Sequence, residues 1–518
     1  MLRRHFLANA AALPLAFNAL PRDLGSLRAL TALGSDPEDR VLVLLQLAGG
    51  NDGLNTLIPL DQYDTLKNLR PNILLPADKL VGIGGDRALH PSFAPMAELY
   101  DAGELAIVQD VSYPEQNRSH FRSQDIWHTG SAADEVLGTG WLGRTLERDH
   151  PEFPTGYPGP GREDPLAVSV GRVVSETCQG TVANFSLTVE NPFRTTAILE
   201  PGGGASTDSK RGRELDFLRT SIAQANQYGA TVKARAEAGN TLAEYPEQNP
   251  VANALRYIAQ MISGGMKTKV YIVTLGGWDT HGAQVDANDA TLGRQPGHMR
   301  LVAEAVSAFV ADLKLLGIRE RVIGMTYSDF GRRIRENGSM GTDHGTAAPL
   351  FLFGDCVRPG VLGNNPVIDP GVDEFEGVPM QYDYRDVYGS ILEDWFGVPE
   401  DEVRNILHED YVKLPILRDC DLPDTSSTLE AAFAKTEIAA APSPFSEHTQ
   451  LRFTTARRGR VRVSVYDGQG RLVETLFERR LPAGEQVVNV NTSAYPAGPV
   501  VFHLQEGDAV RVVRAVKM

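Results

Sequence analysis

The sequence predicts an α/β protein with a mostly parallel sheet, followed by a small C-terminal β-sandwich. Near-continuous apolar runs at residues 40–47 and 322–327 predict strands that are buried on both faces, as parallel strands are. Segments with helical spacing separate several of these runs. After residue 445 the pattern changes to short alternating strands at regular spacing, which is typical of a sandwich.

Length, charge and cysteine content narrow the class of protein. The 518 residues suffice for two or three domains with a sizeable core. The net charge of −16 argues against a nucleic-acid partner, because phosphate-backbone binding needs a basic surface. The three cysteines, Cys178, Cys356 and Cys420, are widely spaced, so they predict no metal-ligand cluster and at most one disulfide.

The N-terminus resembles a twin-arginine export signal. Arg3 and Arg4 precede an uncharged, alanine-rich run from Ala8 to Leu20. The alternative is an ordinary amphipathic N-terminal helix. The run is too short to span a bilayer, and no uncharged stretch of about 20 apolar residues follows, so we expect no transmembrane span. We therefore expect a signal at residues 1–25 and an exported protein, located in the periplasm, at the cell surface or outside the cell.

The core domain is expected to span residues 26–425. Apolar and β-branched runs predict its strands at residues 40–47, 105–109, 166–170, 269–275, 322–327 and 349–354. Helical spacing predicts helices starting at Ser119 and over residues 214–239, 250–263 (with Asn249 as N-cap), 298–315 and 391–396.

Acids and histidines follow several of the predicted strands. In an α/β sheet, ligands bind just past the carboxyl ends of strands, and glycines beside these residues let the backbone approach a ligand closely. A carboxylate near an imidazole suits Zn²⁺ or a similar divalent ion. Plain turns and a hydrogen-bonded loop histidine are the alternatives. The expected metal-binding residues are Asp52, Asp279, His281, Asp329, Asp343 and His344.

A second group of candidates precedes Trp127. Ser119 stands beside His120, with Arg118 and Arg122 close in sequence, so it is a candidate nucleophile in a cationic setting. His120, Arg118 and Arg122 are expected to be catalytic residues with it. The alternative is that Ser119 is the N-cap of a helix, and the two roles are compatible because the helix amides favour negative charge there. Either arginine would orient an anion through paired donors.

The C-terminal part differs in kind. Residues 426–445 are rich in Ala, Pro and Ser and predict a linker. Residues 446–518 carry 11 basic and 7 acidic residues, a net charge of +4 in an otherwise acidic chain. A separate domain with a separate role is the simplest interpretation.

The motifs together resemble the domain-of-unknown-function 1501 family over most of residues 40–412. They are Gly-Gly-Asn-Asp-Gly (49–53), Ser-His-Phe (119–121), Gly-Gly-Trp-Asp-Thr-His (276–281), Ser-Asp-Phe-Gly-Arg (328–332) and Gly-Thr-Asp-His-Gly (341–345). This family is grouped with the alkaline-phosphatase-like superfamily. The resemblance implies a three-layer α/β/α core and a site for two divalent metals at the strand ends.

The resemblance also suggests roles for single residues. It implies that Asp52 is the acid after the first strand and that Ser119 is the nucleophile. Phe330 stands where the superfamily has a metal-binding histidine, which His120 or Asp343 would have to replace, so one or two ions are expected if the site is metal-bound. The motif around residues 465–471 and the segments 443–445, 496–498 and 516–517 resemble the C-terminal sorting domain of type IX secretion cargo.

The sequence thus predicts an exported, metal-dependent hydrolase of phosphate or sulfate esters, with a small anionic ester as substrate and the export and secretion machinery as partners. The alternative is a non-catalytic secreted or surface binding protein on the same fold. A third, carbohydrate-binding interpretation would use exposed aromatic side chains.

Overall fold

The computed structural model describes residues 39–195, 210–418, 420 and 439–518, the last range with gaps at 442, 444, 447, 456–458, 468–470, 482–483, 494, 496 and 507–508. The predicted export signal and most of the predicted linker therefore lie outside the described residues. None of the described helices combines the length and apolar character needed to cross a membrane.

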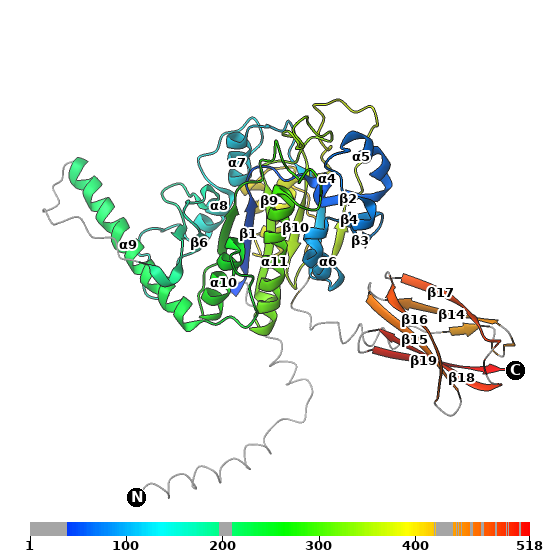
Figure 1. The fold of residues 1–518 in the computed structure, drawn as a ribbon. Helices are drawn as coiled ribbons and strands as arrows, with labels where there is room; N and C mark the ends of the chain where they lie inside the picture. The colour runs from blue at the N-terminus through cyan, green and yellow to red at the C-terminus, as the bar shows by residue number, and fades with distance from the viewer. Residues whose placement is uncertain are drawn as a thin grey trace, which may run out of the picture.

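A nine-stranded, mostly parallel sheet forms the centre of the core (Figure 1). Its main path runs β11-β5-β10-β9-β1-β8-β6-β7, and β12 pairs with β5. β1 pairs in parallel with β8 and β9, whereas β10 is antiparallel to both of its neighbours. The strands are β1 (Val41–Leu47), β5 (Leu105–Ser112), β6 (Ala167–Val170), β7 (Ser186–Val189), β8 (Val270–Leu275), β9 (Val322–Ser328), β10 (Ala348–Phe353), β11 (Gly360–Leu362) and β12 (Tyr382–Asp383).

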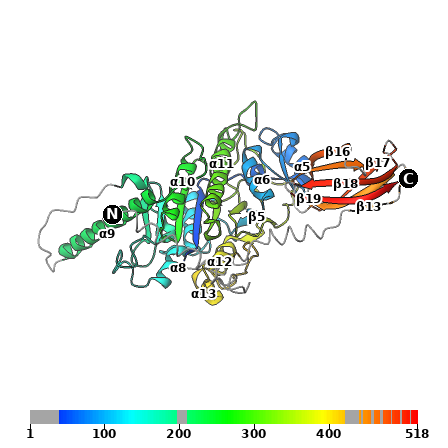
Figure 2. The same ribbon diagram turned by 90° about the horizontal axis from the view of Figure 1, so that it is seen from below.

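Helices cover both faces of this sheet, which makes the core three-layered as expected. Figure 2 shows α6, α10 and α11 on one face and α8, α12 and α13 on the other. The helices are α4 (Gly53–Thr56), α5 (Tyr63–Leu69), α6 (Ala94–Asp101), α7 (His120–Thr129), α8 (Trp141–Asp149), α9 (Lys210–Ala238), α10 (Pro250–Ser263), α11 (Arg294–Leu315), α12 (Tyr384–Asp394) and α13 (Glu400–Ile406). A small sheet adds β2 (Leu57–Pro59), β3 (Val81–Gly84) and β4 (Arg87–Leu89).

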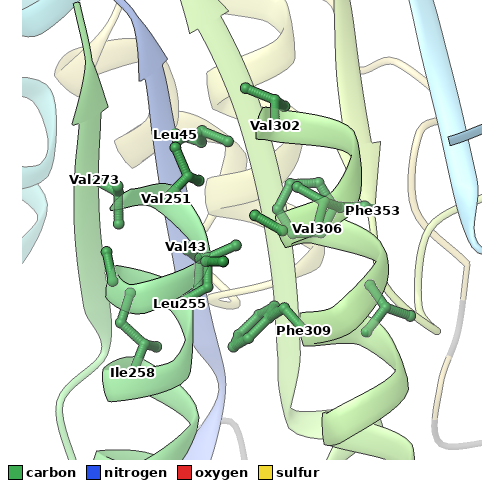
Figure 3. Packing of buried hydrophobic residues seen from close by; sticks show 14 of the residues in the cluster. Val43, Leu45, Val251, Leu255, Ile258, Val273, Val302, Val306, Phe309 and Phe353 are labelled. Carbon is green, nitrogen blue, oxygen red and sulfur yellow. The ribbon is translucent and has the colours of Figure 1, made fainter. Parts of the chain in front are cut away.

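The central strand shows why the apolar runs are continuous. All seven residues of β1 are buried, and alternate ones contribute to the clusters on opposite faces. Val43 and Leu45 point toward α10 and α11, where they pack near Leu255 and Val306 (Figure 3). Leu44 belongs to the cluster on the other face. A strand between two helical layers has no solvated face, so its sequence shows no polar alternation.

The C-terminal part forms two small antiparallel sheets, β13-β14-β17 and β16-β15-β18-β19, around their own apolar cluster. The short strands predicted after residue 445 are confirmed as β14 to β19, and a further strand, β13, lies within the predicted linker. Three alanines form β13 by pairing with β14, so backbone pairing overrides the linker-like composition. The strands are β13 (Ala439–Ala441), β14 (His448–Thr455), β15 (Gly459–Asp467), β16 (Leu472–Leu481), β17 (Gly484–Asn491), β18 (Gly498–Glu506) and β19 (Ala509–Lys517).

Local signals placed some helix ends better than others. The predicted cap Asn249 is confirmed, since its side chain accepts from the Ala252 N–H at 3.0 Å. By contrast, α12 starts at Tyr384 rather than near Ile391, because the side chain of Asp383 caps the helix there. Cys356 pairs with Cys420 in the one disulfide that the cysteine count permits.

Asp110 lies at the carboxyl end of β5 and provides a pH-dependent prediction. The residue is 5% exposed and has φ +50°, and burial raises the pKa of its carboxyl to about 7. The folded state therefore retains a proton that the unfolded chain releases near pH 4, so the stability contribution of Asp110 falls as pH rises from about 4 to 7.

We expect Asp110→Asn to stabilise the protein near neutral pH, by on the order of 3 kcal/mol, and to leave stability unchanged below about pH 4. Asparagine tolerates the left-handed backbone and can still accept from Gln381. Urea unfolding across this pH range is the measurement, with the exposed Asp78→Asn as control. A difference in the free energy of unfolding between Asp110→Asn and the unsubstituted protein that does not change with pH would contradict the raised pKa of Asp110.

Candidate metal centre

Four segments meet at the carboxyl edge of the sheet. They are the loops after β1, β8 and β9, and the first turn of α7, which follows β5. The approach of the loops depends on glycine: Gly49 has φ +124°, and a Cβ there would lie 2.4 Å from the Asp279 nitrogen. A Cβ on Gly341 would lie 2.5 Å from the carbonyl carbon of His281. These glycines thus bring the loops into contact with one another.

Three imidazoles and one carboxylate converge at this edge. The Oδ1 atom of Asp279 lies 3.1 Å from His281 Nε2, 3.3 Å from His344 Nε2 and 3.5 Å from His120 Nε2. His281 Nε2 and His344 Nε2 are 2.8 Å apart. We call His120, Asp279, His281 and His344 the imidazole group. Three members of the group, Asp279, His281 and His344, were predicted as metal ligands. His120 was predicted as a catalytic residue.

The opposite ring nitrogen of each histidine faces an oxygen acceptor. The Nδ1 of His120 lies 2.8 Å from Asp329 Oδ2, and that of His281 lies 2.8 Å from Asp343 Oδ1. The Nδ1 of His344 lies 2.7 Å from the carbonyl oxygen of Arg118. Because these oxygens accept, each Nδ1 carries the hydrogen and each Nε2 directs a lone pair into the group. Such outer partners orient metal-binding histidines.

The residues fit one divalent cation. Two Nε2 lone pairs 2.8 Å apart repel unless a proton or a cation lies between them, and His120 Nε2 is buried without a hydrogen-bond partner. Tetrahedral Zn²⁺ with bonds near 2.0–2.1 Å would separate its ligand atoms by about 3.3 Å. The distances from Asp279 Oδ1 to the three Nε2 atoms, 3.1–3.5 Å, and the 2.8 Å between the Nε2 atoms of His281 and His344 scatter around this value. Potential ligand atoms of His120, Asp279 and His344 all lie within 4.8 Å of one another, and His281 joins them through its contacts with Asp279 and His344. Three imidazole nitrogens and one carboxylate oxygen suit Zn²⁺ or a similar ion.

Charges around the group favour an ionised carboxylate at its centre. Burial alone would raise the pKa of Asp279, but the hydrogen bond from Arg332 and the nearby histidines hold it below its usual value. The hydrogen bond to Asp329 raises the pKa of His120. Burial lowers the pKa of His344, which favours its neutral, metal-binding form.

The buried side chains of Arg332 and Phe330 pack against the imidazole group from the protein interior. Fully buried Arg332 donates to Asp279 Oδ1 at 2.8 Å and to the carbonyl oxygens of Gly49, Gly50, Trp278 and Thr342. The buried ring of Phe330 lies 4.8 Å from the His120 ring and 4.7 Å from the His344 ring. An aromatic ring therefore packs against two of the imidazoles at the position where the sequence resemblance led us to expect a histidine. No role was predicted for Arg332 from the sequence, because a buried arginine has no periodic signal.

Asp329 and Asp343 hold imidazoles in place rather than joining the imidazole group. Asp329 Oδ2 also accepts from Gly49 N and from Gln124 Nε2, each at 3.0 Å. Asp343 accepts in addition from Asn337 and pairs with Arg333 at 3.3 Å. Both were predicted as metal ligands, but in the structure their bonded oxygens face the Nδ1 atoms.

Asp52 does not reach the imidazole group. Its buried carboxylate pairs with fully buried Arg70 at 2.9 Å and accepts from Gln284 Nε2 at 2.7 Å. Gln284 Oε1 accepts in turn from the hydroxyls of Thr280 and Thr342, at 3.0 and 2.7 Å. The expected ligand role of Asp52 is therefore corrected: its oxygens are engaged, and it ties together the two loops that carry Asp279, His281 and His344.

The three other predicted catalytic residues, Ser119, Arg122 and Arg118, make different contacts. α7 begins after Ser119, as predicted for its N-cap, although the exposed Ser119 side chain makes no cap hydrogen bond. Arg122 pairs with Asp125 and with loop carbonyls, so the expected anion-orienting role is corrected for this residue. Arg118 is half-buried and donates to the Phe375 carbonyl oxygen at 2.6 Å. Burial and the nearby charge of Arg333 lower the pKa of Arg118.

A cavity of about 780 Å³ lies at the carboxyl ends of β6, β7 and β8 and includes no member of the imidazole group. The chemistry of the donor atoms, rather than cavity size, therefore marks the candidate site.

A protein-family match covers the part of the chain that carries the imidazole group. The model of the family described as "Protein of unknown function (DUF1501)" matches residues 76–374. The chain belongs to this family. The matched range holds every member of the imidazole group, whereas Asp52 and its loop precede it. No curated protein matches the chain.

Several solved structures are distantly similar to this chain. A sulfatase from Pseudoalteromonas sp. is 12% identical, with a TM-score of 0.33, covering 91% of this chain and 88% of that chain. A protein in the alkaline phosphatase superfamily from Vibrio parahaemolyticus is 12% identical, with a TM-score of 0.30, covering 85% and 82%. A phosphonate monoester hydrolase from Silicibacter pomeroyi is 11% identical, with a TM-score of 0.29, covering 92% and 88%. These scores carry no conclusion about activity.

Proposed function

We propose that this DUF1501 protein is a metal-dependent hydrolase of phosphate or sulfate esters. The observation that supports the proposal most is the convergence of three Nε2 atoms on Asp279 Oδ1, each imidazole being oriented by an oxygen at Nδ1. A divalent ion held there would polarise an ester oxygen and lower the pKa of a water molecule.

The chain's own residues would perform the other steps. His120, His281 and His344 would offer their Nε2 atoms to the ion, while Asp329 and Asp343 orient the rings of His120 and His281. Arg332 keeps Asp279 ionised and rigid. Arg118 would orient the anionic group. Ser119, exposed at the start of α7, is the proposed nucleophile, where the helix amides favour an anionic oxygen.

Metal content and turnover together test the proposal. We expect about one zinc or similar ion per purified chain, since four donors suffice for one tetrahedral site. A chelator should abolish hydrolysis of 4-nitrophenyl phosphate or 4-nitrophenyl sulfate and lower the melting temperature, and zinc should restore both. Protein that holds no divalent ion, and whose melting temperature ignores the chelator, would favour the non-catalytic binding protein instead.

We also propose that the protein is exported and that residues 446–518 serve as a type IX sorting domain. The support is the twin arginine at Arg3 and Arg4 and the separate antiparallel sheets at the other end of the chain. Removing residues 446–518 should leave the protein inside the outer membrane of a host with that secretion system. Unchanged secretion of the truncated protein would rule the sorting role out.

A further inference from the structure

The rim of the imidazole group carries a guanidinium group without an acidic partner. Arg118 forms no ion pair with any carboxylate among the described residues, and its guanidinium donates to a neutral carbonyl, that of Phe375. Glu376 influences Arg118 only at longer range. A half-buried cation that lacks a counter-charge, in a chain of net charge −16, is unusual because desolvation penalises an unpaired charge.

A second guanidinium group lies beside it. The guanidinium of Arg333 sits 4.8 Å from the centre of the Phe375 ring, the same residue that Arg118 contacts. Both arginines also touch His344: Arg118 through its carbonyl oxygen at 2.7 Å, and Arg333 through a 3.4 Å hydrogen bond to the His344 carbonyl. Phe375 is 56% exposed, so the two arginines and this ring border solvent next to the imidazole group.

We propose that Arg118 and Arg333 form an anion clamp that selects a doubly charged phosphate monoester over a singly charged sulfate ester. This inference rests on the proposed hydrolase site and names its substrate class. Three carboxylates and three guanidinium groups lie at the group and its rim, and Glu376 acts on Arg118 only at longer range, so the charge of a bound divalent ion is left for the substrate. These charged groups are the carboxylates of Asp279, Asp329 and Asp343 and the guanidinium groups of Arg118, Arg332 and Arg333. A phosphate monoester carries close to two negative charges at neutral pH, whereas a sulfate ester carries one.

Two non-hydrolysable probes of similar shape separate these charges. In mildly alkaline buffer, methylphosphonate carries two charges and methanesulfonate carries one. Calorimetry on the zinc-loaded protein should show methylphosphonate binding at least about tenfold tighter, as expected for one additional charge-assisted contact. Arg118→Met should weaken methylphosphonate binding by about tenfold or more and reduce the preference, because it removes a donor that no carboxylate needs. Arg404→Met, on the distant helix α13, should change neither value.

The outcomes separate this inference from the proposed function. Equal affinity for the two probes, or an unchanged methylphosphonate affinity in Arg118→Met, would overturn the clamp even if nitrophenyl esters are hydrolysed. Methylphosphonate binding that depends on Arg118 in a protein without any esterase activity would support the clamp while the hydrolase proposal falls. Arg118→Lys should restore only part of the affinity, because an ammonium lacks the planar pair of donors.

Discussion

Asp279→Ala is expected to reduce the bound metal from about one ion per chain to background and to remove ester hydrolysis with it. Asp279 Oδ1 is the atom that all three Nε2 atoms approach, at 3.1–3.5 Å. Removing this carboxylate leaves three imidazole nitrogens beside the buried charge of Arg332, which repels a cation. Metal affinity should fall by more than about a hundredfold, since even outer partners of metal ligands are worth 10–100-fold.

The fold should survive this change. Arg332 keeps four backbone carbonyl acceptors, and Asp279 is half-exposed. Elemental analysis and competition with a chromophoric chelator measure the loss, with the exposed Asp78→Ala as control. A variant that keeps its full metal content with an unchanged dissociation constant would show that Asp279 is not a ligand.

Arg70→Met is expected to destabilise the protein by about 3–5 kcal/mol, because it leaves the Asp52 carboxylate buried without a counter-charge. Arg70 is fully buried and also donates to the carbonyl oxygens of Ile334 and Arg333, at 2.9 and 2.8 Å. These contacts fix the loop after β9, and Gln284 links Asp52 to the two loops that carry the metal candidates. The metal affinity of this variant should therefore fall as well.

Denaturant unfolding of the metal-free protein isolates the stability effect. The double variant Arg70→Met, Asp52→Leu should recover part of the loss, since removing both charges avoids an unpaired one. Arg404→Met removes a partly exposed arginine of an ion pair on α13 and should change stability by about 1 kcal/mol or less. A single variant no less stable than this control would mean that the Asp52–Arg70 pair contributes little.

The buried strands were predictable because their environment leaves a direct mark on the sequence. Val41–Leu47 is buried on both faces, so nearly every position is apolar, and the first part of Val322–Ser328 shows the same pattern. The helix boundary at Tyr384 was missed because its cap, Asp383, lies before a segment whose apolar pattern becomes clear only later. The strand at Ala439–Ala441 was missed because three alanines carry no strand signal and acquire one only by pairing.

The sequence pointed to most of the residues at the site, but it did not show which role each of them has. Acids and histidines after strands marked the right loops, because parallel strands end at one edge. Nothing in the sequence distinguishes an acid that faces a cation from one that orients an imidazole, so Asp279 and Asp329 looked alike. The partner of Asp52 is Arg70, eighteen positions away on another element, and only the fold brings them together. The unpaired charge of Arg118 is likewise a property of three-dimensional surroundings.

An anomalous difference map from crystals of the zinc-loaded protein, recorded on both sides of the zinc absorption edge, tests the account most directly. We expect one strong peak, within about 2.0–2.2 Å of the Nε2 atoms of His120, His281 and His344 and of the Asp279 carboxylate. Zinc bound only elsewhere, with these four side chains coordinating nothing, would contradict it.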